Sequence, residues 1–286
     1  MLRPENARQK AALMRAIDKF EAAYEGSPAE EYMHGRGIMP RTAQAHRVGF
    51  VDPARPLEGF ERFAGRICIP YLNVNKEPVW AKFRANPLVR EFKAKYAQQE
   101  GGRGRLFNLP ALNHPGDLIC LAEGELDVMT LTALGIPAVG VPGSKHWRAY
   151  MKRCLDGYGR VVLFYDDDEN GAGKALVAAV KASIPDVIAL AAPGGYNDLN
   201  DAYTNGFGDA IRRLAYGEEE REYDRSRLAA PAGVADAGIP DPERADETPE
   251  SAGDPEPAGS GNELEGPAEA ADRPDPYTDP DAEPWF

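Results

Sequence analysis

The sequence predicts an α/β protein: an α+β amino-terminal part, then a parallel sheet with helices on both faces. Three observations predict this organisation. Residues 117–217 alternate short apolar runs with helical patterns of about ten residues, which is typical of parallel strand–helix units. Residues 66–84 hold two apolar runs around a polar turn, which predicts a hairpin. Residues 229–286 contain 16 acidic residues and 11 prolines, a composition that favours a disordered acidic tail.

Charge separates this tail from the rest of the chain. The net charge is −13, whereas residues 229–286, with 16 acidic and 2 basic residues, carry −14 on their own. We divide the chain into an amino-terminal helix (1–26), a basic subdomain (27–115), an α/β domain (116–217) and the tail (218–286). There is no signal peptide and no apolar run long enough to span a membrane, so we expect a cytoplasmic protein without membrane contact.

The amino-terminal part begins with helical patterns. Apolar residues on one face predict a helix over residues 5–24. Ser27-Pro28-Ala29-Glu30 is a capping box that begins a second helix, which ends near Gly35. A third short helix is predicted over Pro40–His46.

The predicted hairpin lies in a basic segment. Its strands span Arg66–Leu72 and Val79–Arg84, and residues 55–105 contain 11 Lys and Arg against 5 Asp and Glu, with aromatic residues interspersed. Such a surface suits nucleic acid, because cations neutralise phosphates and aromatic rings stack on unpaired bases. The alternative is that the aromatic residues are core and the charges form an ordinary solvated face.

The strand–helix alternation follows. Strands are predicted over Leu118–Ala122, Pro137–Val141, Arg160–Tyr165 and Val187–Ala191. Helices are predicted over Glu125–Leu134, His146–Leu155, Gly173–Ser183, Asp198–Thr204 and Asp209–Gly217. In parallel sheets of this kind, ligands bind at the carboxyl ends of the strands.

Acidic residues follow three of these strands. Glu123 comes after the first, Asp166-Asp167-Asp168 after the third, and Asp198 and Asp201 after the fourth. Carboxylates gathered at one sheet edge repel one another unless divalent cations neutralise them, and Mg²⁺ prefers oxygen ligands. The pattern predicts a two-metal centre for phosphoryl transfer. The alternative is a solvated loop after a strand.

The same residues resemble a known domain. Glu123-Gly124-Glu125-Leu126-Asp127 matches the EGxxD element of the Toprim domain, and Asp166-Asp167-Asp168-Glu169-Asn170-Gly171 matches its DxDxxG element. Toprim domains occur in topoisomerases, recombination mediators, some nucleases and bacterial-type (DnaG-type) DNA primases. Residues 29–38 (AEEYMHGRGI) and 65–71 (GRICIPY) resemble the YLxxRGI and GRixfPi segments of those primases. The resemblance covers residues 27–215 and is to the primase catalytic core, in the small phage-encoded version without a zinc-binding domain.

This resemblance implies roles for individual acids. Asp166 and Asp168 would be catalytic metal ligands, and Glu123 a ligand or the acid/base at the attacking 3′-hydroxyl. Asp198 would be a further carboxylate of the metal site. The implied cofactor is Mg²⁺ or Mn²⁺.

Other candidates have a structural alternative. Asp127 and Asp201 are each either part of the metal site or a helix cap, and Asp167 occupies the variable position of its motif. The candidates for template or nucleotide phosphate contacts are Arg66, Lys82, Arg84 and Lys95. A simple salt bridge is the alternative for any one of these cations.

The expected partners are single-stranded DNA template and NTPs. No zinc is expected in this chain, because its three cysteines and four histidines lack the spacing of a zinc site. A separate zinc-binding primase subunit, a replicative helicase or single-stranded-DNA-binding machinery would then be further partners. The terminal Trp285-Phe286 resembles the tip of bacterial single-stranded-DNA-binding proteins and is a candidate partner motif; a solubilising tail is the alternative.

The expected function is that of a DNA primase, a DNA-directed RNA polymerase that synthesises short primers in DNA replication, in the host cytoplasm if the chain is phage-encoded. A Toprim nuclease that uses the same metals and a non-catalytic nucleic-acid-binding module are the alternatives. The upstream RGI and GRICIPY segments favour the primase.

Overall fold

The computed structural model describes residues 4–98, 104–141, 146–167 and 171–217. All of them belong to one unit, residues 1–240. The predicted metal ligand Asp168 and the predicted tail, with Trp285 and Phe286, lie outside the described residues.

Three helices come first, as predicted: α1 (Pro4–Ala22), α2 (Pro28–Gly35) and α3 (Pro40–Ala45). Ser27 is the N-cap of α2, and its hydroxyl accepts the main-chain N–H groups of Ala29 at 3.2 Å and Glu30 at 3.4 Å. The Glu30 carboxylate accepts the N–H of Gly26 at 2.7 Å. Serine before proline thus supplies the local signal that begins α2.

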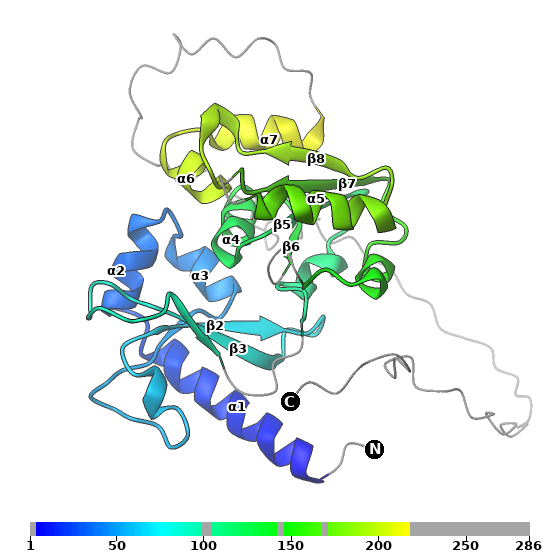
Figure 1. Ribbon diagram of the computed structural model, residues 1–286. Coiled ribbons are helices and arrows are strands. Elements are labelled where there is room, and N and C mark those ends of the chain that lie inside the picture. The colour runs from blue at the N-terminus through cyan, green and yellow to red at the C-terminus, as the bar shows by residue number, and fades with distance from the viewer. Residues whose placement is uncertain (1–3, 99–103, 142–145, 168–170, 218–286) are drawn as a thin grey trace, which may run out of the picture. The chain divides into compact units, whose positions relative to one another are not determined.

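An antiparallel sheet follows, in the order β1-β2-β3-β4. Its strands are β1 (Gly49–Phe50), β2 (Ile67–Leu72), β3 (Pro78–Arg84) and β4 (Tyr96–Gln98). The predicted hairpin is β2–β3, whereas the short β1 and β4 were not predicted. Alternation along β2 sends Cys68 into a core with Phe20 of α1, and Ile67, Ile69 and Tyr71 into a core with α4. Figure 1 shows α1 lying along this sheet.

The second sheet is parallel, as predicted, in the order β6-β5-β7-β8. Its strands are β5 (Leu118–Ala122), β6 (Ala138–Gly140), β7 (Arg160–Tyr165) and β8 (Ile188–Ala191). The chain passes from β5 to β6 on one side and then to β7 on the other. The strand order therefore reverses between β5 and β7, and their carboxyl ends form a topological switch point, where open α/β sheets bind ligands.

Helices cover both faces of this parallel sheet (Figure 1). One face carries α4 (Glu125–Ala133), α6 (Leu199–Thr204) and α7 (Gly208–Tyr216), and the other carries α5 (Ala172–Ser183) and the 3₁₀ helix η4 (Ala149–Cys154). Along β5, Leu118 and Cys120 enter the core with α4, while Ile119 and Leu121 enter the core with α5. Burial on both faces explains why β5 is an unbroken apolar run.

One predicted helix is wrong in type. The α-helix expected over His146–Leu155 is the 3₁₀ helix η4, because the backbone is extended at Arg148 (φ −127°, ψ 141°). The helix therefore spans only the six residues that follow Arg148. The described residues also include the 3₁₀ turns η1 (Glu61–Phe63), η2 (Leu109–Asn113) and η5 (Pro193–Gly195), which connect elements. No described helix has the length and apolar character needed to cross a membrane.

The two sheets share a core, and this holds the site together. Ile69 and Tyr71 of β2 are buried in the same cluster as Leu126 and Met129 of α4. Phe107, from the connection between the sheets, pairs with Gly140 of β6 through N–H···O bonds of 2.8 and 3.0 Å. The antiparallel sheet is therefore packed beside the amino-terminal end of α4, which follows directly from β5.

Candidate metal and nucleotide pocket

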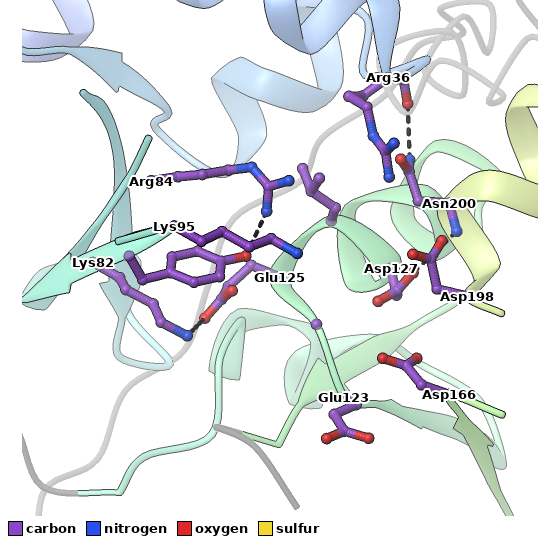
Figure 2. Close-up of a pocket in the computed structure, with 13 residues that line it drawn as sticks. Arg36, Lys82, Arg84, Lys95, Glu123, Glu125, Asp127, Asp166, Asp198 and Asn200 are labelled. Atoms are coloured by element: carbon purple, nitrogen blue, oxygen red, sulfur yellow. Dashed lines mark hydrogen bonds and ion pairs between the residues drawn. The ribbon is translucent and has the colours of Figure 1, made fainter. Parts of the chain in front are cut away.

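Besides Glu125, which is described below, four carboxylates line one pocket at the switch point (Figure 2). Glu123 directly follows β5 and Asp166 directly follows β7. Asp198 precedes α6, and Asp127 lies in the first turn of α4. We call these four side chains the acidic wall. The sequence-based prediction that acids from three strand ends meet at one sheet edge is confirmed for Glu123, Asp166 and Asp198.

Four basic side chains line the same pocket from the amino-terminal part: Arg36, Lys82, Arg84 and Lys95. Arg36 follows α2, Lys82 and Arg84 belong to β3, and Lys95 directly precedes β4. We call these the basic wall. Figure 2 shows the side chains of Lys82, Arg84 and Lys95 grouped on one side and the acids Glu123 and Asp166 on the other. A pocket with opposite charges on its two sides can accept phosphates and cations together.

Glycines let the acidic wall come close to its helices. A Cβ atom at Gly173, in the first turn of α5, would overlap the main-chain oxygen of Asp166. A Cβ atom at Gly124, the N-cap of α4, would overlap the carboxylate of Asp127. Position 173 therefore requires glycine because the main chain passes too near for a side chain, whereas a side chain at position 124 would force the Asp127 carboxylate to shift.

Asp127 is a buried acid of this wall with a raised pKa. Burial, together with the negative charges of Asp166 and Asp198, raises its pKa to about 8. The main-chain N–H of Asn200, which donates to Asp127 Oδ1 at 3.0 Å, and the charge of Arg36 act in the opposite direction. The mutual repulsion shows that these carboxylates are close enough to interact, and a divalent cation would relieve it.

The helix-cap alternatives for the two weaker acids are resolved by geometry. The N-cap position of α4 belongs to Gly124, and Asp127 instead accepts from α6. Asp198, not Asp201, caps α6: its Oδ1 accepts the N–H of Asp201 at 2.7 Å. The Asp201 carboxylate pairs with Arg36 Nη1 at 3.0 Å.

Asn200 connects three helical segments beneath the acidic wall. Its side-chain Nδ2 donates to the carbonyl of Arg36 at 2.8 Å and to Thr130 Oγ1 at 2.9 Å. Its main chain donates to Asp127, and the residue is fully buried. Asn200 lies between Asp198 and Asp201 in the sequence, but the sequence-based prediction relied on charged residues and an amide carries no charge.

A hydrogen-bonded group of side chains lies where the two sheets meet. Glu125, the first residue of α4, is buried, and its Oε1 accepts from Tyr71 at 2.6 Å and from Lys82 Nζ at 2.6 Å. Burial, together with the Glu125 charge and hydrogen bond, raises the pKa of Tyr71 well above its usual value, so its hydroxyl remains a donor. The Lys82 ammonium also lies 4.3 Å from the ring centre of Tyr96.

The remaining predicted cations differ in their surroundings. Arg84 is buried, and its guanidinium donates to the hydroxyls of Tyr32 at 2.8 Å and Tyr96 at 2.6 Å. Lys95 is exposed and lines the pocket, and its Nζ lies 5.9 Å from the centre of the Tyr96 ring. Arg66 does not line the pocket. Its buried guanidinium donates to the carbonyls of Phe83 and Ala94, which favours the structural alternative over a phosphate contact.

The two remaining candidates are Asp167, which does not line the pocket, and Asp168. Asp167 is half exposed and pairs with Lys174 at 3.2 Å, as expected for a variable position. Asp168 is not among the described residues. Within the described ranges, no three His, Cys, Asp or Glu side chains converge closely enough to hold a metal ion ready-made. The all-oxygen donors of the acidic wall nevertheless fit a hard divalent cation such as Mg²⁺.

Residues missed from the sequence are Arg36, Glu125 and Asn200, each of which lines the pocket. Arg36 was recognisable as the one cation inside the RGI segment, between two glycines. Glu125 occupies a position that the EGxxD pattern leaves open, so the pattern gave no signal for it.

Comparison with known proteins identifies the family. A family model described as Toprim-like matches residues 120–203, which confirms the predicted domain. The gene 57 protein of Mycobacterium phage D29 is 31% identical over 151 residues, covering 52% of this chain and 97% of that protein. This chain belongs to the same family as the phage protein. The predicted resemblance to a phage-encoded protein is thereby confirmed.

Solved structures confirm the fold of this family member. The Aquifex aeolicus primase, with zinc-binding and RNA polymerase domains, superimposes with a TM-score of 0.61 at 22% identity, over 73% of this chain and 60% of that one. The chain thus spans less than two thirds of that primase. The RNA polymerase domain of Mycobacterium tuberculosis DnaG, in complex with a double-stranded DNA oligomer with a 6-nucleotide overhang, gives 0.60 at 21% identity, over 73% and 80% of the two chains. The chain has the fold of a DnaG-type primase catalytic core.

Proposed function

We propose that the chain is a DNA primase, a metal-dependent nucleotidyltransferase that joins NTPs into short RNA primers on single-stranded DNA. The observation that carries this proposal is the single pocket in which an acidic wall at the switch point faces a basic wall. Phosphoryl transfer needs both, because cations must neutralise the triphosphate and the template while carboxylates hold divalent ions at the reacting groups.

The acidic wall would hold the metal ions. Glu123, Asp166 and Asp198, with Asp168, are the proposed ligands of Mg²⁺ or Mn²⁺. Such ions, when bound, lower the pKa of an attacking hydroxyl and neutralise the charge on the leaving phosphates. Glu123 is either a ligand or the base that accepts the proton of the primer 3′-hydroxyl, and both roles require it to stay ionised.

Three side chains of the basic wall, Arg36, Arg84 and Lys95, would bind and orient the substrates. Lys95 is exposed at the pocket and is the proposed contact to template or nucleotide phosphates. Arg84 is fixed by two tyrosine hydroxyls, which orients its remaining donor groups before a substrate arrives. Arg36, held by Asp201, supplies a further positive charge near Asp127.

The comparisons support DNA as the template. A structural neighbour with the same fold is a primase domain crystallised with DNA that carries a single-stranded overhang. A zinc-binding subunit, a replicative helicase or single-stranded-DNA-binding machinery would act in trans, with Trp285-Phe286 as the proposed docking motif.

The test incubates the full chain with end-labelled single-stranded DNA, labelled NTPs and Mn²⁺. The proposal predicts new labelled RNA, intact template, no product with EDTA and none from Asp168→Asn. Shortened template strands without RNA would identify a Toprim nuclease instead. DNA binding without either product would identify a non-catalytic module, and full synthesis by Asp168→Asn would overturn the metal assignment.

A further inference from the structure

Glu125 joins the basic wall to the acidic wall without belonging to either. It is the first residue of α4 and lies two residues after Glu123. Its Oε1 binds Tyr71 of β2 and Lys82 of β3, so one carboxylate oxygen contacts two strands of the antiparallel sheet. Figure 2 shows the Glu125–Lys82 pair on the side of the pocket opposite Asp127 and Asp198.

The pair is shielded from water and held on several sides. The side chain of Lys82 is 19% exposed and that of Glu125 only 5%. The ammonium is 2.6 Å from the carboxylate and lies over the ring of Tyr96. A phosphate that took Lys82 would leave a buried, uncompensated carboxylate, which is costly in a region of low dielectric. Lys82 is therefore engaged by the protein itself, unlike the exposed Lys95.

We propose that Glu125 is a positioning residue, which clasps Tyr71 and Lys82 and thereby fixes the Glu123–Gly124 turn against the basic wall. Lys82 serves this clasp and is not a phosphate contact. The clasp sets the separation between the cations that bind phosphates and the carboxylates at the reacting groups. This role replaces the phosphate contact that the sequence suggested for Lys82. The part of the test that measures turnover rests on the proposed primase function.

The clasp predicts a division between binding and turnover. Removing both charges, in the double variant Lys82→Met/Glu125→Gln, leaves the net charge of the pocket unchanged. Binding of phosphates should therefore persist. Turnover should fall, because small displacements of reacting groups cost large factors in rate. A loss of stability alone would instead reduce binding and turnover by the same fraction.

The experiment compares this double variant with two controls in the full-length chain. Lys95→Met removes the exposed cation of the same pocket. Lys10→Met/Glu77→Gln removes another lysine–glutamate pair, 2.8 Å long, that also joins a helix to the β2–β3 hairpin but does not line the pocket. The readouts are the affinity for fluorescent single-stranded DNA across salt concentrations, and kcat and KM for NTP in primer synthesis.

The clasp variant should keep its DNA affinity within about twofold and the wild-type salt dependence, with kcat lowered about tenfold or more and KM within about twofold. Lys95→Met should weaken DNA binding and reduce the salt slope by about 0.7. Lys10→Met/Glu77→Gln should match the wild type. A clasp variant that loses DNA affinity as Lys95→Met does, or one that keeps full turnover, overturns the proposal.

If the wild type makes no RNA, the proposed function is refuted but the clasp is not. The clasp can then be tested by a double-mutant cycle that compares the free energies of unfolding. In urea unfolding, Glu125→Gln should lower the free energy of unfolding more than the double variant does, because the single change leaves the Lys82 ammonium without its carboxylate partner. Additive effects of the two single changes would show that the pair is not coupled and would overturn the clasp.

Discussion

The raised pKa of Asp127 makes the stability of the metal-free protein depend on pH. The folded pKa of about 8 lies above the ordinary value of 3.8, so the folded state binds this proton more tightly than the unfolded state. Its contribution to stability is therefore complete below about pH 4 and is lost as the pH rises through 8. A shift of about four units at ~1.4 kcal/mol per unit corresponds to roughly 6 kcal/mol.

Asp127→Asn isolates this effect, because the amide keeps an oxygen that can accept the N–H of Asn200 but carries no charge. We expect the variant to gain stability relative to the wild type as the pH rises from 5 to 8.5 in EDTA, as measured by urea unfolding. Mg²⁺ should shrink the difference, since a bound cation offsets the charges of Asp166 and Asp198.

Asp167→Asn is the matched control, the same chemical change at a half-exposed acid outside the pocket. It should follow the pH dependence of the wild type. If Asp127→Asn and the wild type also showed parallel pH dependences in EDTA, Asp127 would be ionised in the folded protein, and the description of a repelling acidic wall would be wrong.

Three further predictions follow from packing and burial. Gly173→Ala should abolish metal-dependent synthesis because its Cβ overlaps the main chain at Asp166, whereas Gly35→Ala, which meets no atom within 4 Å, should leave synthesis intact in the same assay. Burial lowers the pKa of His46 to about 4, so the wild type should lose roughly 3 kcal/mol between pH 6.5 and 4, and urea unfolding should show no such loss in His46→Gln. Asn200→Ala should lower the free energy of unfolding by roughly 1–3 kcal/mol, measured with urea, since it leaves buried groups without their hydrogen bonds.

The parallel sheet could be predicted almost to the residue because its signals are local. Strands β5 and β7 are short apolar runs bounded by acids and glycines, and the observed bounds equal those expected. The two-residue β1 and three-residue β4 carry no such run and exist through pairing with β2 and β3. Pairing between distant segments overrides local propensity, so sequence patterns could not predict them.

The sequence predicts the site residues that are acids directly following a strand. It does not predict the roles of cations whose partners are buried. Glu123 and Asp166 follow from the rule that parallel strands end at one edge. In the sequence, Arg66 and Lys82 are both cations in a basic segment. In the structure, Arg66 donates to main-chain carbonyl groups, whereas Lys82 donates to a carboxylate. Such partners come from elements distant in sequence, which composition does not reveal.

The measurement that tests the central claim most directly is template-directed synthesis on oligo(dT). The full chain is incubated with this template, Mn²⁺ and all four NTPs, and the product is analysed for base composition. The account predicts short RNA that contains adenylate alone, absent with Asp166→Asn and present with Lys10→Met/Glu77→Gln. RNA of mixed composition, RNA formed without template, or undiminished RNA from Asp166→Asn would contradict it.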